Sequence, residues 1–186
     1  MAADQAAFEQ ALQATPARKA TAAVDAELEW SILARPYEDI LGTSLSDGSK
    51  PNTEMLLKRS MVDSGLSTYR AKNRYQRVRP FVGNDVGTCK PEQEEVLEGD
   101  GSYPSGHTAV GWMLALVLTE LAPEKQDALL KRGYEYGESR VVCRAHWQSD
   151  TTAGRVIASA TFARLQADPT FQAQLELARA EMARQD

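Results

Sequence analysis

The sequence is poor in histidine and cysteine, the usual zinc ligands, and lacks the usual glycine-rich motif that binds nucleotides. It has two histidines and two cysteines among its 186 residues. Neither histidine belongs to an HxH or HExxH pattern, and Cys89 and Cys143 lie far apart, so a zinc or two-metal site would need an unusual all-carboxylate arrangement. A glycine-rich Walker loop is also missing, which argues against an ATP-driven motor or a kinase of that type. We therefore expect a protein without a metal or other cofactor.

Long apolar runs and an excess of positive charge are missing as well. The longest apolar run, residues 109–118, is interrupted by Gly111 and is much shorter than the ~20 residues of a membrane-spanning helix. The N-terminus shows no basic segment followed by an apolar one, so no secretory signal is visible. The formal net charge of -5 argues against a nucleic-acid partner, which would favour a basic face. We expect a soluble protein with no membrane insertion.

The patterning predicts an all-α fold. A chain of 186 residues fits one domain, and no stretch of alternating β-branched residues suggests a sheet. We expect a single domain over residues 1–186, with N-terminal helices in 1–50 and the chemistry-bearing blocks within 72–150. Loops are predicted at 42–52 and 81–103. The predicted helices are 4–14, 21–33, 53–63, 67–77, 105–121, 124–137, 149–167 and 170–183.

One predicted helix differs from the others because it is apolar on nearly every side. Residues 107–121 include Trp112, Met113 and Leu114, and this composition predicts a buried central helix of a bundle. Before it, Ser105 can cap the helix and Gly106 lets the backbone approach an anion. A phosphate at this helix start would meet the positive end of the helix dipole.

Three short blocks carry the candidate chemistry. They combine cations, both imidazoles and one carboxylate, which is the inventory of a phosphoryl-transfer site. In sequence order the blocks are Lys72-x6-Arg79-Pro80, Pro104-Ser105-Gly106-His107 and Ser139-Arg140-x5-His146-x3-Asp150.

These blocks resemble the three-part signature of the type 2 phosphatidic acid phosphatase superfamily, which also contains the vanadium haloperoxidases. The sequence around the blocks is similar to that of the soluble bacterial class A non-specific acid phosphatases, in particular at Gly101-Ser102-Tyr103 and Trp147-Gln148-Ser149. The resemblance runs from roughly Thr53 to the C-terminus. It implies the all-α fold of that superfamily and a metal-independent hydrolysis of phosphomonoesters, with possible transfer to alcohols or nucleosides. It also implies a periplasmic or secreted homo-oligomer whose signal has been removed.

The resemblance assigns a role to each signature residue. His146 attacks phosphorus, Asp150 accepts a hydrogen bond from the other ring nitrogen of His146, and His107 is the general acid and then the general base. The residues that bind the phosphoryl oxygens are Lys72, Arg79, Ser105, Gly106 and Arg140.

Two other functions compete with this interpretation. A vanadium haloperoxidase would bind vanadate to the same nitrogen of His146. A non-catalytic phosphate-binding bundle would keep the arginines but would need neither His146 nor Asp150. Taken alone, Asp150 could also be an ordinary carboxylate at a helix start, interacting with the dipole.

The remaining polar residues near the blocks leave alternatives open. Cys89 and Cys143 are either two buried free thiols or a disulfide that ties two site segments together in an oxidising compartment. We expect Arg70, Arg74 and Arg77 to be solvated. Arg144 either tunes substrate choice or points to solvent.

Overall fold

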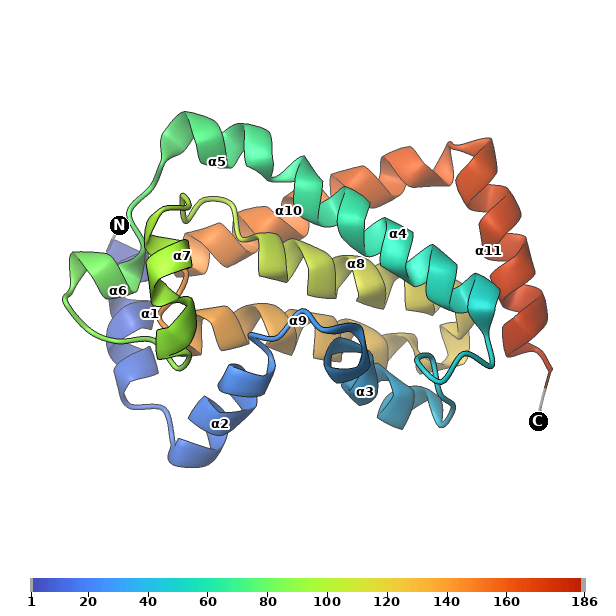
Figure 1. Ribbon diagram of the computed structural model, residues 1–186, viewed down its shortest axis with the longest axis horizontal. Coiled ribbons are helices and arrows are strands. Elements are labelled where there is room, and N and C mark those ends of the chain that lie inside the picture. Colours follow the sequence, from blue (N-terminus) through green and yellow to red (C-terminus); the bar gives the residue numbers. More distant parts are fainter. Residues whose placement is uncertain (1, 185–186) are drawn as a thin grey trace.

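A computed structural model describes residues 2–184, and this part of the chain is a bundle of helices without strands (Figure 1). The all-α, single-domain prediction is confirmed. No helix in the described range combines the length and apolar character needed to cross a bilayer. In chain order the helices are α1 (Ala2–Leu12), α2 (Pro16–Val24), α3 (Trp30–Leu41), α4 (Pro51–Ser67), α5 (Tyr69–Tyr75), α6 (Pro80–Gly83), η1 (Pro91–Gln93), α7 (Glu94–Glu98), α8 (Gly106–Leu121), η2 (Pro123–Lys125), α9 (Gln126–Val142), α10 (Gln148–Gln166) and α11 (Pro169–Met182).

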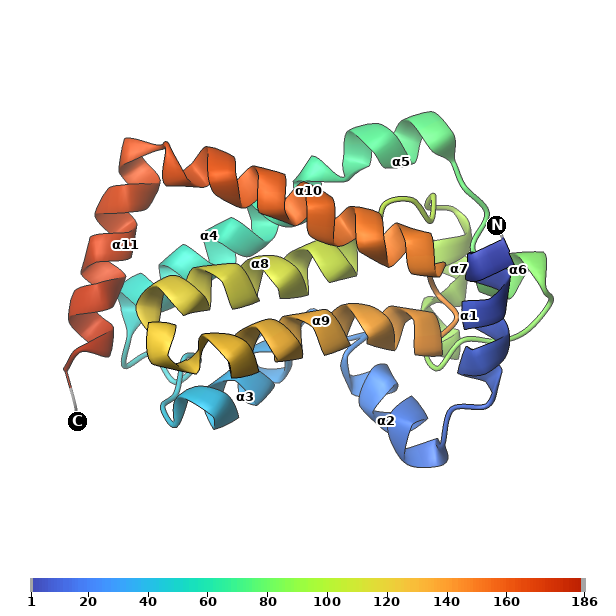
Figure 2. The ribbon, with the colours of Figure 1, turned by 180° about the vertical axis from the view of Figure 1, so that it is seen from behind.

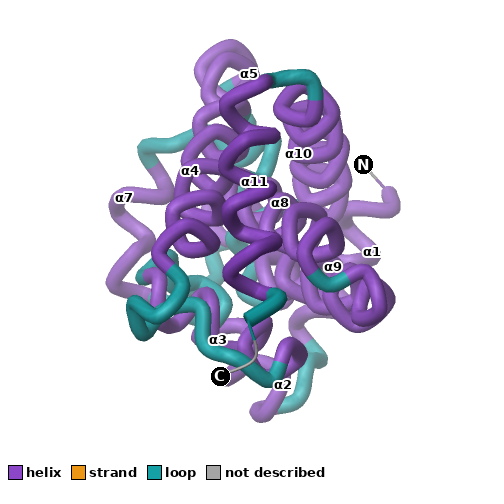
Figure 3. The backbone as a smooth tube through the Cα atoms, turned by 90° about the vertical axis from the view of Figure 1, so that its right-hand side faces the viewer, coloured by secondary structure: helices purple, strands orange, loops and turns teal. Residues whose placement is uncertain are grey.

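Helix α8 forms the centre of the bundle, as predicted. Helices α4, α9 and α10 pack around it, which is visible from both faces (Figures 1 and 2) and from the end (Figure 3). Met113, Leu114, Val117 and Leu118 of α8 are buried in the main hydrophobic core. Burial on all sides follows from the absence of a polar stripe on this helix.

Two glycines let α8 and α9 approach closely. A Cβ atom on Gly111 of α8 would lie 2.2 Å from a ring carbon of Tyr136, and one on Gly133 of α9 would lie 2.6 Å from the Cβ of Ala115. Neither distance is possible for a real side chain, so both positions require glycine. The close approach fixes α9, whose last turn carries Arg140.

The predicted helix 21–33 is wrong, because the chain breaks there into two helices. Helix α2 ends at Val24, and α3 begins only after Glu29, whose side chain accepts hydrogen bonds from two N–H groups of the first turn of α3. Apolar periodicity alone does not reveal such a cap. Helix α3 then continues through Pro36 to Leu41 and is capped by Gly42, which has a φ of 74°. Burial of Tyr37 and its neighbours on one face offsets the hydrogen bond that Pro36 removes.

Two further boundaries differ from the prediction and matter for the site. The segment 81–103, predicted as loop, contains most of α6 as well as η1 and α7. The predicted helix 124–137 begins as η2 and continues as α9 to Val142. As a result the three signature blocks meet at one end of the bundle, where α5, α6 and α7 lie beside the start of α8 and α10 and the end of α9 (Figures 1 and 2).

Candidate active site

A cavity of about 290 Å³ lies where the three signature blocks meet. Its lining includes five residues of the predicted site, namely Lys72, Arg79, Gly106, His107 and His146. A larger and more open hollow of about 610 Å³ is lined by residues of α4 and α10 and by Asp168, and it contains no histidine. The smaller cavity is therefore the candidate active site.

His146 lies in the turn between α9 and α10 and is buried. Its Nδ1 is 2.8 Å from the carbonyl oxygen of Ser102, and its Nε2 is 3.1 Å from Nη1 of Arg79. A guanidinium only donates and a carbonyl only accepts, so these partners assign the proton to Nδ1 and a lone pair to Nε2. Burial, with the charges of Arg79 and Arg140, lowers the pKa of His146 well below its usual 6.5. The ring is held neutral, and the lone pair of Nε2 faces Arg79 at the cavity.

Asp150 does not make the direct hydrogen bond to His146 that the family pattern implies. Its Oδ2 lies 3.7 Å from Nδ1, because that nitrogen donates to the Ser102 carbonyl instead. The Ser102 hydroxyl bridges the pair, donating to Asp150 while lying 3.4 Å from Nδ1. Asp150 also accepts from the N–H of Trp147 at the start of α10. The carboxylate thus caps a helix and supports His146 through Ser102 at the same time.

Lys72 and Arg79 form one buried cationic wall of the cavity. Burial lowers the pKa of both side chains, and the carboxylate of Asp100 opposes this effect. Nζ of Lys72 lies 2.9 Å from Asp100 Oδ2, and Nη2 of Arg79 lies 3.1 Å from the same oxygen. Asp100 also lines the cavity. No motif indicates this residue, because it precedes the second signature block and has no position in the pattern.

Arg140 is a buried cation that forms no ion pair within residues 2–184, although the charges of Asp25 and Glu27 act on it. Its side chain is 1% exposed, and its Nε and Nη1 have no hydrogen-bond partner among the described residues. Burial lowers its pKa to about 10. Buried guanidinium groups are normally paired, because leaving them unpaired is costly. Such free donors near two histidines are suited to an oxyanion.

His107 is half-buried in the first turn of α8. Its Nε2 lies 3.1 Å from the carbonyl oxygen of Ala26, and among the described residues Nδ1 has no hydrogen-bond partner, so Nδ1 can take or release a proton. Burial and the charge of Arg140 lower the pKa of His107 well below 6.5. Protonation of this ring therefore requires acidic solution or an anion close by.

Ser105 and Gly106 occupy the start of α8 as the sequence indicates. The Ser105 hydroxyl accepts from the N–H and hydroxyl of Thr108, so in this structure it acts as the helix cap. The N–H of Ser105 donates to the carbonyl of Asp150 and ties this helix start to α10. Gly106 borders the cavity, where a Cβ would lie 3.9 Å from the side chain of Lys72.

Arg77 is not the solvated residue that the sequence analysis predicts. Its guanidinium bridges Asp150 at 2.6 Å and Asp4 of α1 at 2.8 Å. Asp4 also accepts hydrogen bonds from Ser149. Arg70 and Arg74 are exposed, as expected. The N-terminal helix thus supports the carboxylate behind His146, a role that no motif indicates.

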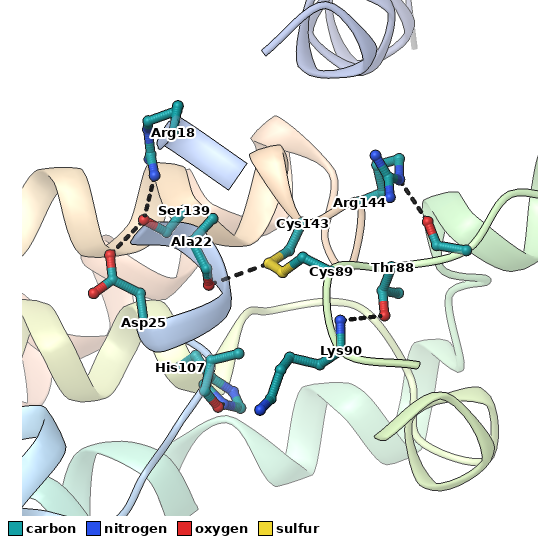
Figure 4. The surroundings of a disulfide bond; sticks show 12 residues. Arg18, Ala22, Asp25, Thr88, Cys89, Lys90, His107, Ser139, Cys143 and Arg144 are labelled. Atoms are coloured by element: carbon teal, nitrogen blue, oxygen red, sulfur yellow. Dashed lines mark hydrogen bonds between the residues drawn. A yellow bond between two sulfur atoms is a disulfide. The ribbon is translucent and has the colours of Figure 1, made fainter. Parts of the chain in front are cut away.

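A disulfide joins the segment before η1 to the end of α9. The structure pairs Cys89 with Cys143, with 4.9 Å between their Cα atoms, and so contains the second of the two alternatives for these cysteines. The bond lies beside Ala22 of α2 (Figure 4). The neighbouring Arg144 donates to the carbonyl of Gly87 and does not line the cavity. Among residues 2–184, no group of three His, Cys, Asp or Glu side chains is arranged to hold a metal ion.

Comparison with known proteins agrees with this geometry. The model of the PAP2 superfamily matches residues 55–169. The chain belongs to the PAP2 superfamily. It is 44% identical over 183 residues to a non-specific acid phosphatase of Providencia stuartii, covering 97% of this chain and 74% of the relative. It is 46% identical to a non-specific acid phosphatase of Salmonella typhimurium, covering 87% of this chain and 65% of the relative. An acid phosphatase of Zymomonas mobilis is 41% identical, with 89% and 62% covered.

The match to the PAP2 superfamily includes every predicted site residue. Residues 55–169 contain all three signature blocks, and the structure gathers these at one cavity or directly behind it. The similarity to curated relatives also extends into the N-terminal helices, since the match to the Providencia stuartii protein covers 97% of the chain. The resemblance noted in the sequence begins only at about Thr53. Asp4 shows that this N-terminal region also contributes to the site.

Proposed function

We propose that the protein is an acid phosphatase that hydrolyses phosphomonoesters through a phosphohistidine on Nε2 of His146. The coarser assignment, an acid phosphatase of the PAP2 superfamily, rests on the family match and on the relatives named above. The observation that supports the mechanism most strongly is the state of His146. A neutral ring presents a lone pair at a cavity that also contains His107 and fixed cations.

In the first step, Nε2 of His146 forms a bond to phosphorus as the bond from phosphorus to the ester oxygen breaks. Lys72, Arg79 and Arg140 hold the phosphoryl oxygens, and two nitrogens of Arg140 have no other partner among the described residues. Imidazolium charge develops on His146, and the Ser102 carbonyl and nearby Asp150 stabilise it. His107 passes its proton to the departing alkoxide.

In the second step, His107 takes a proton from water, whose oxygen attacks phosphorus as the N–P bond breaks. Phosphate leaves and His146 returns to its neutral state. An alcohol or the hydroxyl of a nucleoside can take the place of water at this step, and the product is then a new phosphate ester. Phosphotransferase activity is therefore part of the proposal.

The lowered pKa values of both histidines favour activity in acid. His146 must be neutral to attack, and its lowered pKa keeps it so well below pH 6.5. His107 must be protonated, which becomes more frequent as the pH falls and as a bound phosphoryl group adds negative charge. A less negative substrate is also attacked more easily. We expect an acidic optimum for these reasons.

The resemblance to the family also implies a cellular location and an oligomeric state. We propose a periplasmic or secreted location, since disulfides such as Cys89–Cys143 persist in oxidising compartments. A homo-oligomer remains a prediction from the resemblance alone. Analytical ultracentrifugation of the oxidised protein measures the oligomeric state directly.

A panel of phosphomonoesters, assayed from pH 4 to 8 with and without EDTA, tests the proposed function. We expect hydrolysis with an acidic optimum and no effect of EDTA. Loss of activity on chelation, restored by zinc or magnesium, contradicts the metal-independent mechanism. His146→Ala should lose turnover yet still bind phosphate, whereas Arg70→Ala on the exposed face of α5 should match the wild type. Halide oxidation on addition of vanadate, without phosphatase turnover, would instead support the haloperoxidase alternative.

A further inference from the structure

Asp100 places a carboxylate inside a pocket built to bind anions. Its Oδ2 lies 2.9 Å from Nζ of Lys72 and 3.1 Å from Nη2 of Arg79, the two cations of one cavity wall. The side chain is 36% exposed and lines the same cavity as His107 and His146. A negative charge at this point opposes the binding of any anion, so its presence requires an explanation.

The backbone holds Asp100 firmly in this position. Nε of Arg79 donates to the carbonyl oxygens of Asp100 and Leu97, at 2.9 and 2.7 Å. Nζ of Lys72 donates to the carbonyl of the next residue, Gly101, at 2.5 Å. The same cations that hold the carboxylate therefore also fix the main chain on which it is carried.

Counting donors shows that both cations can bind Asp100 and a second anion together. Lys72 has three N–H donors, of which the carboxylate and the Gly101 carbonyl occupy two. Arg79 has two N–H groups on Nη2, and Asp100 occupies one. The contacts with described residues therefore leave one N–H donor free on each cation. An anion that accepts from both lies beside the Asp100 carboxylate.

We propose that Asp100 selects a protonated phosphoryl group over a fully ionised anion. This inference rests on the proposed function of the site. A carboxylate accepts hydrogen bonds but donates none, so it attracts a P–OH group and repels a bare oxyanion. Hydrogen phosphate species carry such a hydroxyl, whereas sulfate at the same pH does not. Asp100 is thus a specificity-determining residue that favours the monoanionic substrate, which is also the one more easily attacked.

A simple counter-ion would behave differently from a selector. A counter-ion weakens the binding of every anion, and a dianion more than a monoanion, because it only lowers the positive potential of the pocket. A selector weakens sulfate but strengthens protonated phosphate, because only phosphate gains a hydrogen bond in return. The direction of the change in phosphate affinity therefore separates the two roles: removing the charge of Asp100 tightens phosphate binding if Asp100 is a counter-ion and weakens it if Asp100 is a selector. A general loss of structure would weaken the binding of both anions.

The experiment compares phosphate and sulfate binding by isothermal titration calorimetry at pH 5 and constant ionic strength. Phosphate is then mainly the monoanion, since its second pKa is about 6 to 7, and sulfate is a dianion. The wild type should bind phosphate more tightly than sulfate. Asp100→Asn should tighten sulfate binding and weaken phosphate binding, and so reduce the preference for phosphate roughly tenfold, the effect of one charge-assisted hydrogen bond. Asp100→Glu and the exposed control Asp39→Asn should keep the preference.

Tighter binding of phosphate by Asp100→Asn, an unchanged ratio in that variant, or tighter binding of sulfate than of phosphate by the wild type would overturn the inference. The wild-type comparison remains decisive if the variant does not fold. Calorimetry needs no turnover, so the result is independent of the proposed function. A protein that hydrolyses phosphomonoesters but shows no dependence on Asp100 contradicts this inference alone, and one without phosphatase activity contradicts the proposed function.

Discussion

Replacing Arg140 with methionine should make the protein more stable and inactive at once. The guanidinium is 1% exposed, two of its nitrogens have no partner among the described residues, and burial lowers its pKa to about 10. At pH 7 the group is charged in both the folded and the unfolded state. The lowered pKa then corresponds to about 3 kcal/mol that opposes folding. Methionine removes this charge and keeps an apolar stem, so after allowance for imperfect packing we expect a gain of about 2 kcal/mol.

Thermal unfolding and steady-state kinetics measure the two effects together. A gain of this size raises the Tm by roughly 6 °C in a domain of this length. The same variant should lose at least ~100-fold in kcat/KM, because a preorganised donor to the phosphoryl oxygens is gone. Added phosphate should raise the Tm of the wild type more than that of the variant. Arg70→Met, on the exposed face of α5, is the matched control and should change neither quantity.

Two results would refute this reasoning. A marked loss of stability in Arg140→Met would show that contacts within the protein already satisfy the guanidinium. Retention of activity would show that Arg140 does not hold the phosphoryl group. Arg140→Lys keeps the positive charge but lacks the forked donor geometry, so it should gain no stability and should still lose activity.

Three further predictions address His107, the disulfide and the pH dependence of stability. His107→Ala should slow hydrolysis of glycerol phosphate more than that of nitrophenyl phosphate, whose leaving group needs little protonation, and equal losses on both substrates contradict an acid role. Cys89→Ser/Cys143→Ser should lower the free energy of unfolding by about 4 kcal/mol in urea titrations. An unchanged value would show that the two thiols are free in the native oxidised protein. The pKa of His146 is lower in the folded than in the unfolded protein, so protonation of this ring favours unfolding. The contribution of His146 to the free energy of unfolding therefore falls as the pH drops below 6.5, by up to about 1.4 kcal/mol per pH unit. Urea unfolding at pH 7.5 and 5.5 should show a weaker pH dependence in His146→Ala, and an equal dependence would contradict the lowered pKa.

The residues that the sequence could predict are those whose type and spacing are constrained by chemistry. A helix that is apolar all round can only be central, and α8 is. Lys72, Arg79 and His146 meet because their blocks flank helix ends at one side of the bundle. Residue type is informative in these cases, since few side chains can bind phosphate or attack phosphorus.

The rest of the site depends on contacts that leave no trace in local sequence. Asp4 and Arg77 pair across 73 positions, and nothing near either residue indicates the other. The hydrogen bond of His146 goes to the Ser102 carbonyl, and every residue carries such a group, so no pattern could favour it over Asp150. Asp100 was missed for a related reason, because a carboxylate in an acidic loop resembles an ordinary surface residue until the fold places it between two cations.

Rapid-quench trapping of the phosphoenzyme tests the central claim most directly. Wild-type protein mixed with labelled nitrophenyl phosphate and quenched within milliseconds should carry acid-labile phosphate, and peptide mapping should place it on His146. His146→Ala should carry none, while His107→Ala should accumulate the intermediate, since its loss impairs the attack of water more than the departure of nitrophenol. Turnover by the wild type without any phosphate on His146, or the label on another residue, would contradict the mechanism even if the protein is a phosphatase.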